Sequence, residues 1–212
     1  MSKYQFKASD IYLPGTDIPK NRLGIEDAEL LHEIEKNLLI ASYRIQVSEL
    51  QPETRFDETY FIGLHKHTFA SLYDWAGEYR SEDMSKGESL FCLAQHLPAQ
   101  MKRLFHNLEQ ERFLRQAKST TKEHFAERLA YYQCELIALH PFYELNGRIT
   151  RQFFDLIAIA NGYYPIDYSQ ALNQDAIPNS YIEASIACVQ RADNRQLQQF
   201  ILDGLTRMDE AI

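Results

Sequence analysis

The sequence predicts an all-α, mostly helical protein, a helical bundle that carries one short β-hairpin. Apolar residues recur at helical spacing along most of the chain, strand candidates are few, and the glycines and prolines are scattered rather than clustered. Aromatic residues make up 12% of the chain, and we expect most of them to fill the core between the helices.

The helical segments follow one another in a regular order. The apolar residues of each segment repeat with the period of an amphipathic helix. On this basis we expect helices over residues 26–50, 59–73, 97–108, 122–139, 148–161, 178–191 and 195–208. In the segment 148–161 the inward stripe consists of Ile149, Phe153, Leu156, Ile157 and Ala160. Arg148 and Arg151 therefore lie on a different side from the core stripe, as a ligand site would require.

The composition of the chain and the absence of a linker-like stretch predict a single domain spanning residues 1–212. No low-complexity tract, repeat or apolar run of roughly 20 residues interrupts the chain, and its start lacks the pattern of a signal peptide. We therefore expect a cytoplasmic protein without membrane contact. The net charge of −8 argues against direct binding to nucleic acid. The cysteines Cys92, Cys134 and Cys188 are odd in number and widely spaced, so we expect core packing rather than a disulfide or a zinc site.

Residues 140–151 concentrate reactive and phosphate-binding side chains between two predicted helices. The segment reads His140-Pro141-Phe142-Tyr143-Glu144-Leu145-Asn146-Gly147-Arg148-Ile149-Thr150-Arg151. A helix that opens near Gly147 presents unpaired backbone N–H groups and its positive dipole end, which together bind anions such as phosphate. Arg148 and Arg151 stand three apart, so we expect both guanidinium groups to face the same polyphosphate. Glu144 suits Mg²⁺, and His140 is a candidate general base.

This segment resembles the motif of Fic proteins, His-Pro-Phe-x-Asp/Glu-Gly-Asn-Gly-Arg-x-x-Arg, at every position except Leu145. The resemblance implies a Fic-like helical bundle and a protein adenylyltransferase, which moves AMP from ATP to a hydroxyl side chain of a target protein. It also implies the roles of the residues: His140 as the general base, Glu144 as the magnesium ligand, Asn146 as an α-phosphate contact, and Arg148 and Arg151 as holders of the outer phosphates.

Leu145 stands where the family pattern has glycine. Glycine at such a position indicates a positive φ or a close approach to ligand. If φ is positive here, leucine carries a strain of roughly 1–3 kcal/mol, and if φ is negative the strain vanishes. In both cases we expect its side chain to take up space near the phosphates.

Residues 81–96 resemble the target-docking flap of the same family. The run Lys86-Gly87-Glu88-Ser89 predicts a turn between two short extended pieces, and the edge of such a hairpin can pair with a strand of a target. We expect Leu90 and Phe91 to pin the target segment, Lys86 to touch a phosphate, and Gly87 to form the turn. A surface hairpin without that function is the alternative reading of the same residues.

The resemblance also bears on regulation and partners. Fic proteins are commonly restrained by a helix with the pattern Ser/Thr-x-x-x-Glu-Gly/Asn, which this sequence lacks. We therefore expect a separate small antitoxin that acts on Arg151, and a toxin–antitoxin role. The resemblance makes the ATPase subunits of bacterial gyrase and topoisomerase IV candidate targets.

Two other functions fit the same residues. One is a Fic-like phosphotransferase that moves a different part of the nucleotide. The other is a catalytically silent nucleotide-binding interaction module, in which Leu145 blocks productive placement of ATP. The mass added to a modified target would separate the first from AMP transfer, and ATP binding without pyrophosphate release would favour the second.

Overall fold

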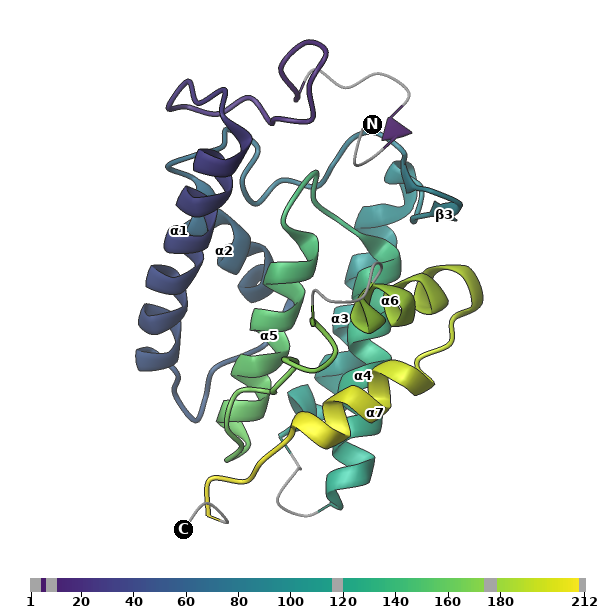
Figure 1. Cartoon of the computed structure of the whole chain (residues 1–212). Helices are drawn as coiled ribbons and strands as arrows, with labels where there is room; N and C mark the ends of the chain where they lie inside the picture. Colours follow the sequence, from purple (N-terminus) through teal and green to yellow (C-terminus); the bar gives the residue numbers. More distant parts are fainter. Residues whose placement is uncertain (1–4, 7–10, 116–119, 174–178, 210–212) are drawn as a thin grey trace.

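The computed structural model of the chain describes residues 11–115, 120–173 and 179–209, together with the backbone of residues 5–6 (Figure 1). Within these residues the elements are, in chain order, β1 (Gln5–Phe6), α1 (Ala28–Ser48), α2 (Glu58–Phe69), β2 (Met84–Lys86), β3 (Ser89–Leu90), the 3₁₀ turn η1 (Ala94–His96), α3 (Leu97–Gln110), the 3₁₀ turn η2 (Arg112–Leu114), α4 (Lys122–Leu139), α5 (Asn146–Ala160), α6 (Ser180–Arg191) and α7 (Arg195–Gly204). The predicted fold class, a helical bundle with one short hairpin, is confirmed.

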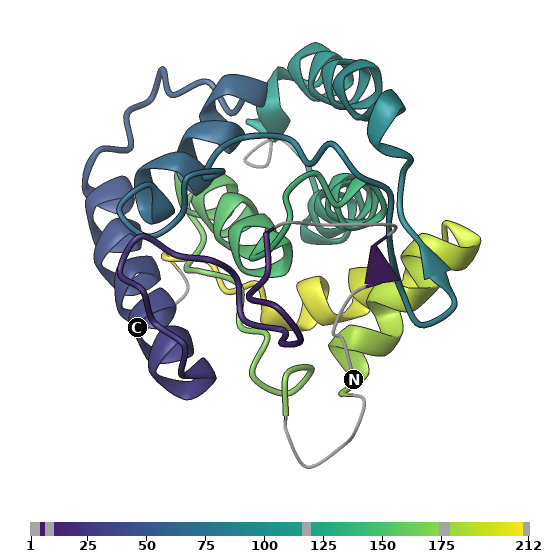
Figure 2. The same ribbon diagram turned by 90° about the horizontal axis from the view of Figure 1, so that it is seen from above.

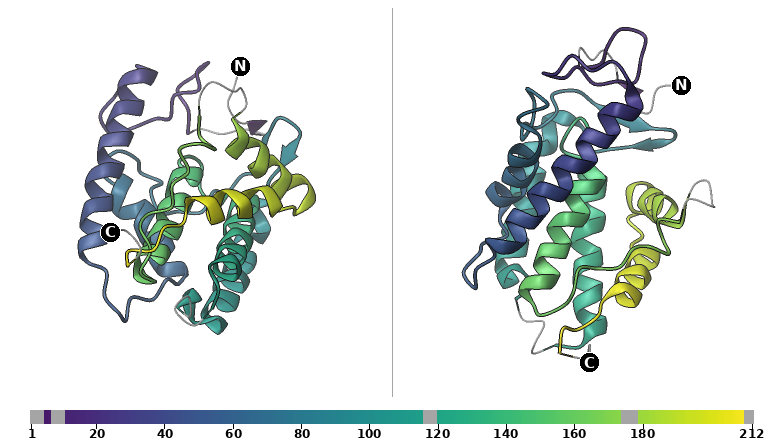
Figure 3. Two further views of the ribbon diagram at one scale, coloured as in Figure 1. Left: turned by 60° about the horizontal axis from the view of Figure 1, so that its bottom comes forward. Right: turned by 60° about the vertical axis from the view of Figure 1, so that its left-hand side comes forward.

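Helices α4 and α5 form the centre of the bundle. Helix α4 contacts α3, α5, α6 and α7, while α5 also contacts α1 and α2. Seen from above, the other helices stand around this central pair (Figure 2). The side view in Figure 3 places α1 on one side of the pair and α6 with α7 on the other. The loop between α4 and α5, residues 140–145, therefore lies at one end of the bundle with different helices on its two sides.

An aromatic cluster joins the helices to this loop. The ring of Phe153 on α5 meets Phe61 of α2 at 5.3 Å and Phe105 of α3 at 5.8 Å between centroids, both edge to face. Phe61 in turn stacks on Phe142 of the loop at 5.6 Å. All four rings are buried. Each such pair adds roughly 0.5–1.5 kcal/mol beyond the burial itself, so the loop is anchored from below by Phe142.

The helix ends follow local chemistry. The side chains of Asp27, Asp57, Thr121 and Asn179 each accept a hydrogen bond from the backbone N–H three residues on and so start α1, α2, α4 and α6. Helix α7 ends at Gly204, short of the predicted 208, where an added Cβ would collide with the carbonyl of Asp167. The predicted helix 59–73 likewise stops at Phe69. The predicted start at position 178 lies outside the described residues.

The flap is a hairpin with a third strand added from the start of the chain. Strands β2 and β3 are antiparallel, and Gly87 in the turn between them has a φ of +58°. Strand β1 pairs with the other edge of β2, which gives the order β1-β2-β3. None of the helices in the described ranges combines the length and apolar character that crossing a bilayer requires.

Cys134 and Cys188 pack in the core as expected, but the expectation that they form no disulfide is wrong. Cys134 on α4 and Cys188 on α6 form a disulfide, with their Cα atoms 5.2 Å apart. These residues are separated by 54 positions in the sequence, so their spacing carried no sign of the contact. It arises because α6 packs against α4. Cys92 is free and partly buried.

Candidate active site

The loop 140–145 bends the chain between α4 and α5 through two left-handed residues. His140 has φ 49° and ends α4, and Leu145 has φ 68° directly before α5. The side chain of Asn146, the first residue of α5, closes the loop by bonding to the backbone of Phe142. Its Oδ1 accepts from the Phe142 N–H at 2.8 Å, and its Nδ2 donates to the Phe142 carbonyl at 2.7 Å. Asn146 thus holds the loop as well as standing at the start of α5.

Arg80 holds the loop and the flap together from inside the protein. Its side chain is buried, and its Nε donates to the His140 carbonyl at 2.8 Å. The same guanidinium donates to the carbonyls of Leu139, Glu82 and Cys92, and the last two flank the hairpin. Burial lowers the pKa of Arg80 from its ordinary value. Because it stays charged, its hydrogen bonds to neutral carbonyls are strong ones, and the loop and flap are fixed relative to each other.

His65 supports the loop from α2. Its Nδ1 accepts a hydrogen bond from the Gly77 N–H at 3.0 Å, so in the neutral ring Nε2 carries the proton and donates to the Glu144 carbonyl at 3.2 Å. The ring also stacks on Phe142 at 4.0 Å. Burial lowers the pKa of His65 to about 4, so the ring is neutral at pH 7. This histidine positions the backbone of the loop.

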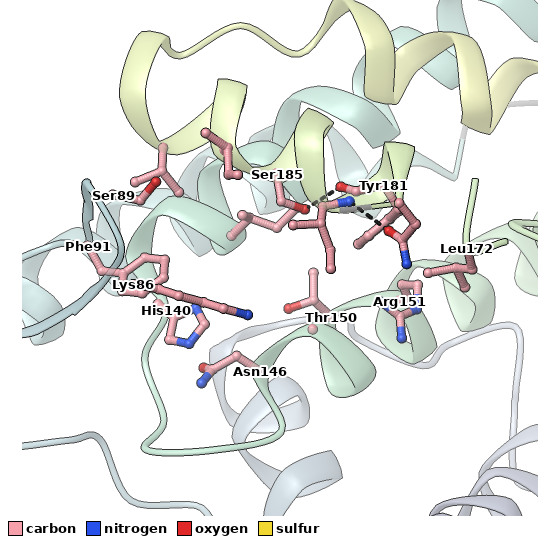
Figure 4. Close-up of a pocket in the computed structure, with 16 residues that line it drawn as sticks. Lys86, Ser89, Phe91, His140, Asn146, Thr150, Arg151, Leu172, Tyr181 and Ser185 are labelled. Atoms are coloured by element: carbon pink, nitrogen blue, oxygen red, sulfur yellow. Dashed lines mark hydrogen bonds between the residues drawn. The ribbon is translucent and has the colours of Figure 1, made fainter. Parts of the chain in front are cut away.

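A cavity of about 330 Å³ lies between the start of α5, the flap and α6 (Figure 4). Its polar part is lined by Lys86, His140, Asn146, Gly147 and Arg151. Its apolar part is lined by Ile137, Leu172, Tyr181, Ile182, Ile186 and Val189. A cavity of this size with a few convergent polar groups is typical of small-molecule sites. The two parts suit the charged phosphates and the flat base of a nucleotide, respectively.

The flap closes over His140. The ring of Phe91 stacks on the imidazole with centroids 3.9 Å apart and planes 14° from parallel, and both side chains are buried. Lys86 extends from the flap across the cavity above His140 toward Thr150 (Figure 4). Of the predicted flap residues, Phe91 and Lys86 therefore face the cavity. Leu90 is 60% exposed, and Gly87 forms the turn.

The two arginines of the segment have different contact partners, although both border a small crevice on the α1 side of α5. That both hold one ligand stays a prediction. Arg151 lines the cavity, with its guanidinium 4.9 Å from the ring centroid of Tyr181 on α6. Arg148 instead turns to α1, where its Nη1 donates to Glu35 Oε2 at 2.8 Å. Arg148 does not line the cavity. The physical reason is the largely buried Glu35 carboxylate on α1, which would be left without its cation if Arg148 turned away.

Glu144 also faces the α1 side. Its Oε1 accepts a hydrogen bond from the Tyr12 hydroxyl at 2.7 Å, and it lines a second crevice together with Glu35 and Arg148 rather than the cavity. In that crevice Glu35 Oε1 accepts from the Tyr73 hydroxyl at 2.6 Å. Within the described ranges no group of three or more His, Cys, Asp or Glu side chains is placed to hold a metal ion. A carboxylate is a ligand that Mg²⁺ accepts, but the Glu144 carboxylate faces Tyr12 and the α1 side rather than the cavity.

Leu145 adopts the positive φ that the family glycine would allow. A leucine in this region of the backbone costs about 1–2 kcal/mol. The side chain is 6% exposed and packs in the core, and it does not line the cavity. The expectation that this side chain crowds the phosphates is therefore wrong. Its burial offsets the backbone strain.

Sequence reasoning assigned no role to four side chains that hold this site. Glu35, His65 and Arg80 bond to residues of the segment 140–148 that lie 60 or more positions away in the sequence. Tyr73 acts through Glu35, to which its hydroxyl donates. In the sequence, Glu35 occupies the same kind of polar helix position as exposed charged residues do. Its position in the pattern therefore did not indicate that its carboxylate is buried against Arg148. Arg80 directly precedes residues 81–96, which resemble the flap of the family, and this was the available signal.

Comparison with known proteins agrees with the geometry. The model of the Fic/DOC family matches residues 55–158. The chain is 32% identical over 163 residues to the "Probable protein adenylyltransferase y4lH" of Sinorhizobium fredii, a match that covers 77% of this chain and 82% of that protein. It is 34% identical over 155 residues to the "Probable protein adenylyltransferase Fic" of Salmonella typhimurium, covering 73% and 74%.

Solved structures share the fold. The structure of BepC, a VirB-translocated effector of Bartonella tribocorum with bound AMPPNP, superposes with a TM-score of 0.77 at 23% identity and covers 93% of this chain and 96% of that one. A Fic domain of Bartonella quintana with bound ADP gives a TM-score of 0.76 at 21% identity, covering 94% and 96%. From its sequence relatives, its motif and its fold, this chain belongs to the Fic/DOC family.

Proposed function

We propose that this protein is an adenylyltransferase that transfers AMP from ATP to a hydroxyl side chain of a target protein. One observation carries the proposal: the imidazole of His140, the start of α5 and Arg151 line the same cavity. That arrangement brings a base next to an anion site. The relatives named above carry the name protein adenylyltransferase, in agreement with this reading.

The proposed reaction follows from the layout of the cavity. The adenosine would lie in the apolar part beside α6, and the phosphates would lie over the first turn of α5, with Arg151 and Lys86 on the outer oxygens. His140 takes the proton of the incoming hydroxyl. The hydroxyl oxygen forms a bond to the α-phosphorus, the bond from that phosphorus to the oxygen bridging to the β-phosphate breaks, and pyrophosphate leaves. Positioning and charge neutralisation supply most of the acceleration.

Glu144 would hold Mg²⁺ beside the phosphates only after leaving the Tyr12 hydroxyl and turning toward the cavity, and the ion would then neutralise part of the phosphate charge. Arg148 could contact the phosphates only after leaving Glu35, so we assign the outer phosphates to Arg151. Asn146 would present the loop and the N-terminus of α5 to the α-phosphate. Phe91 keeps the His140 ring in place beneath the flap.

The biological setting is a further part of the proposal. On the motif resemblance, the protein acts as the toxin of a toxin–antitoxin pair, with the ATPase subunits of gyrase and topoisomerase IV as its targets. The restraining antitoxin would reach Arg151. Burial of Leu145 away from the cavity weighs against the silent binding module, since the feature that motivated it does not fill the nucleotide site.

The test is a labelling experiment with two forms of ATP. Purified protein is incubated with bacterial lysate and ATP labelled at either the α- or the γ-phosphate. AMP transfer labels a protein from the α-labelled form and not from the γ-labelled form, whereas transfer of the γ-phosphate gives the reverse. Transfer from either form should fall by roughly 10²–10⁴-fold in His140→Ala. His106→Ala, an exposed change on α3, is the matched control.

The role of His140 as the base would be disproved by full labelling with His140→Ala. ATP binding by this variant, measured by calorimetry, should stay close to that of the native protein, because the imidazole is expected to act on the hydroxyl rather than on the nucleotide. Absence of any labelled protein with both forms of ATP, while ATP still binds, would instead favour the interaction module.

A further inference from the structure

A disulfide fastens one wall of the cavity to the centre of the bundle. Cys134 on α4 is bonded to Cys188 on α6, and both side chains are buried. Helix α6 carries most of the apolar lining of the cavity, while α4 is one of the two central helices. Figure 4 shows Tyr181 of α6 across the cavity from Asn146 and Thr150 of α5. The disulfide therefore limits how far this wall can move away from the rest of the site.

Residues close to the two cysteines line the cavity itself. On α4, Ile137 lies about one turn after Cys134 and lines the cavity. On α6, Val189 directly follows Cys188 and also lines the cavity. Val189 packs in addition against the apolar cluster of the flap that includes Phe91. A change in the spacing between the two cysteines therefore moves the lining on both helices.

Helix α6 also positions the cation of the cavity. The guanidinium of Arg151 lies 4.9 Å from the ring centroid of Tyr181, and the Tyr181 hydroxyl accepts a hydrogen bond from Gln133 Nε2 at 2.8 Å. Gln133 directly precedes Cys134 on α4. One turn of α4 is thus joined to α6 at two points, Tyr181 and Cys188, which lie about two turns apart. The placement of Arg151 depends on the same contact between α4 and α6 that the disulfide closes.

Opening the disulfide leaves this wall with weaker contacts. Helix α6 has 12 residues, a length that is marginal without packing against the rest of the protein. Besides apolar packing, it keeps the hydrogen bond from Gln133 to Tyr181 and the one from Gln190 Nε2 to Ser89 Oγ at 3.2 Å. Each single hydrogen bond contributes modestly. We therefore expect α6 to fluctuate more when the disulfide is open, so that bound ATP has to order it as well.

We infer that Cys134 and Cys188 form a redox-sensitive clamp on the nucleotide cavity: the closed disulfide fixes α6 and favours ATP binding, and the open pair weakens it. Opening is a thiol–disulfide exchange with a dithiol reductant. The dithiol supplies two electrons and two protons, its own sulfurs join in a disulfide, and the two cysteines become thiols. Such a bond opens in reducing surroundings and closes in oxidising ones. The inference rests on the proposed function, since it assigns a regulation to the same nucleotide site.

The first measurement is ATP binding to the full chain by calorimetry, before and after treatment with dithiothreitol. The oxidised form should bind ATP about fivefold more tightly than the reduced form, the effect of ordering roughly one side chain less on binding. Cys188→Ala cannot form the bond, so it should bind as weakly as the reduced chain and ignore the dithiol. Cys92→Ala, a change of the free cysteine, is the matched control and should keep the full response.

Two results of this measurement overturn the inference. One is equal ATP affinity of the oxidised and reduced native chain. The other is loss of the response in Cys92→Ala, which would assign the redox effect to a different thiol. A thiol titration of the denatured protein, purified without reductant, accompanies the binding data. It should find one thiol per chain, whereas three thiols would show that the clamp does not close.

The second measurement is independent of ATP. Hydrogen exchange of the backbone amides of residues 182–189 should be at least about tenfold faster in the reduced chain and in Cys188→Ala, because a cross-link restricts local opening. Amides of residues 149–158 on α5 should change little, which shows that the bundle stays folded. Equal exchange along α6 in all forms overturns the inference. If exchange differs while ATP binds to no form, the proposed function fails and the clamp on α6 is established.

The third measurement uses the reciprocity of coupled equilibria. If the closed disulfide raises the affinity for ATP, then ATP must favour the closed disulfide by the same factor. In a redox buffer of reduced and oxidised dithiothreitol, saturating ATP should raise the ratio of disulfide to dithiol protein about fivefold, measured by alkylation and mass spectrometry. An unchanged ratio in a protein that binds ATP overturns the inference. If the ratio rises but no lysate protein is labelled from α-labelled ATP, the proposed transfer fails while the clamp stands.

Discussion

The two sides of the loop 140–145 use their polar residues in different ways. On the cavity side, His140, Asn146 and Arg151 surround a space large enough for a ligand. On the α1 side, Glu144 and Arg148 contact protein groups instead, namely the Tyr12 hydroxyl and the Glu35 carboxylate. Neighbouring residues of one sequence segment thus have two different tasks: some line the ligand cavity, and others bond to protein groups that stabilise the fold.

This difference shows that the position of a residue in a motif does not by itself give its task. The side chain of Arg148 is long enough to follow the strongest nearby charge, and Glu35 is 7% exposed and offers one. Burial increases the cost of leaving that carboxylate unpaired. Arg151 lies over the ring of Tyr181 and lines the cavity, while the carboxylate of Asp155 interacts with it electrostatically. Four predictions test this division.

The largest expected effect is on stability and concerns Arg148. Arg148→Ala leaves Glu35 without its cation, and we expect the free energy of unfolding to fall by about 3 kcal/mol, as measured by urea denaturation. In a Glu35→Gln background the same change should cost much less, because the charge is already gone. Equal costs in the two backgrounds would mean that the Glu35–Arg148 pair contributes nothing.

Arg151 should affect the ligand rather than the fold. We expect Arg151→Ala to weaken ATP binding by about 2 kcal/mol, or roughly 30-fold, because a charge-assisted contact to phosphate is lost. The measurement is calorimetry with ATP, with urea denaturation of the same variant beside it. A variant that binds ATP normally but unfolds more easily would place Arg151 with Arg148 among the residues that hold the fold.

Leu145 can be tested by comparing two substitutions. Both Leu145→Ala and Leu145→Gly remove the buried side chain and should destabilise the protein. Glycine alone tolerates the φ of +68° without strain, so we expect Leu145→Gly to be more stable than Leu145→Ala by about 1 kcal/mol. Thermal denaturation of both variants gives the difference. The opposite order, which is usual in a helix, would mean that residue 145 does not hold a positive φ.

The smallest effect concerns pH and Asp155, one turn beyond Arg151 on α5. Burial raises the pKa of Asp155 to about 7, although it accepts from the Ile166 N–H at 3.0 Å and lies near Arg151. The folded state therefore holds a proton that the unfolded state has released above about pH 4. Its contribution to stability is present at low pH and is lost as the pH rises toward 7 and beyond.

Between pH 6 and 8 this loss amounts to about 1 kcal/mol. Asp155→Asn has no proton to release, so its stability should decline less over the same interval. Denaturation curves of both proteins at several pH values provide the measurement. Parallel pH profiles for the native chain and Asp155→Asn would show that Asp155 is not the group responsible.

Much of the fold followed from the sequence because its determinants are local. The period of the apolar residues set the helices, and residues such as Asp27 and Asn179 begin them through hydrogen bonds three residues away. The turn at Gly87 was likewise readable from its own residues. Helix ends moved where a distant contact intervened, as at Gly204 beside Asp167.

The sequence by itself determined the helical framework, the family and the chemistry available in residues 140–151, because those depend on residue types and short spacings. The tertiary structure decided which way each side chain turns. It paired Arg148 with Glu35, joined Cys134 to Cys188, buried Leu145 and laid Gln5–Phe6 along β2. Each of these contacts joins residues far apart in the chain, and only packing of the helices and the flap brings such groups within reach of one another.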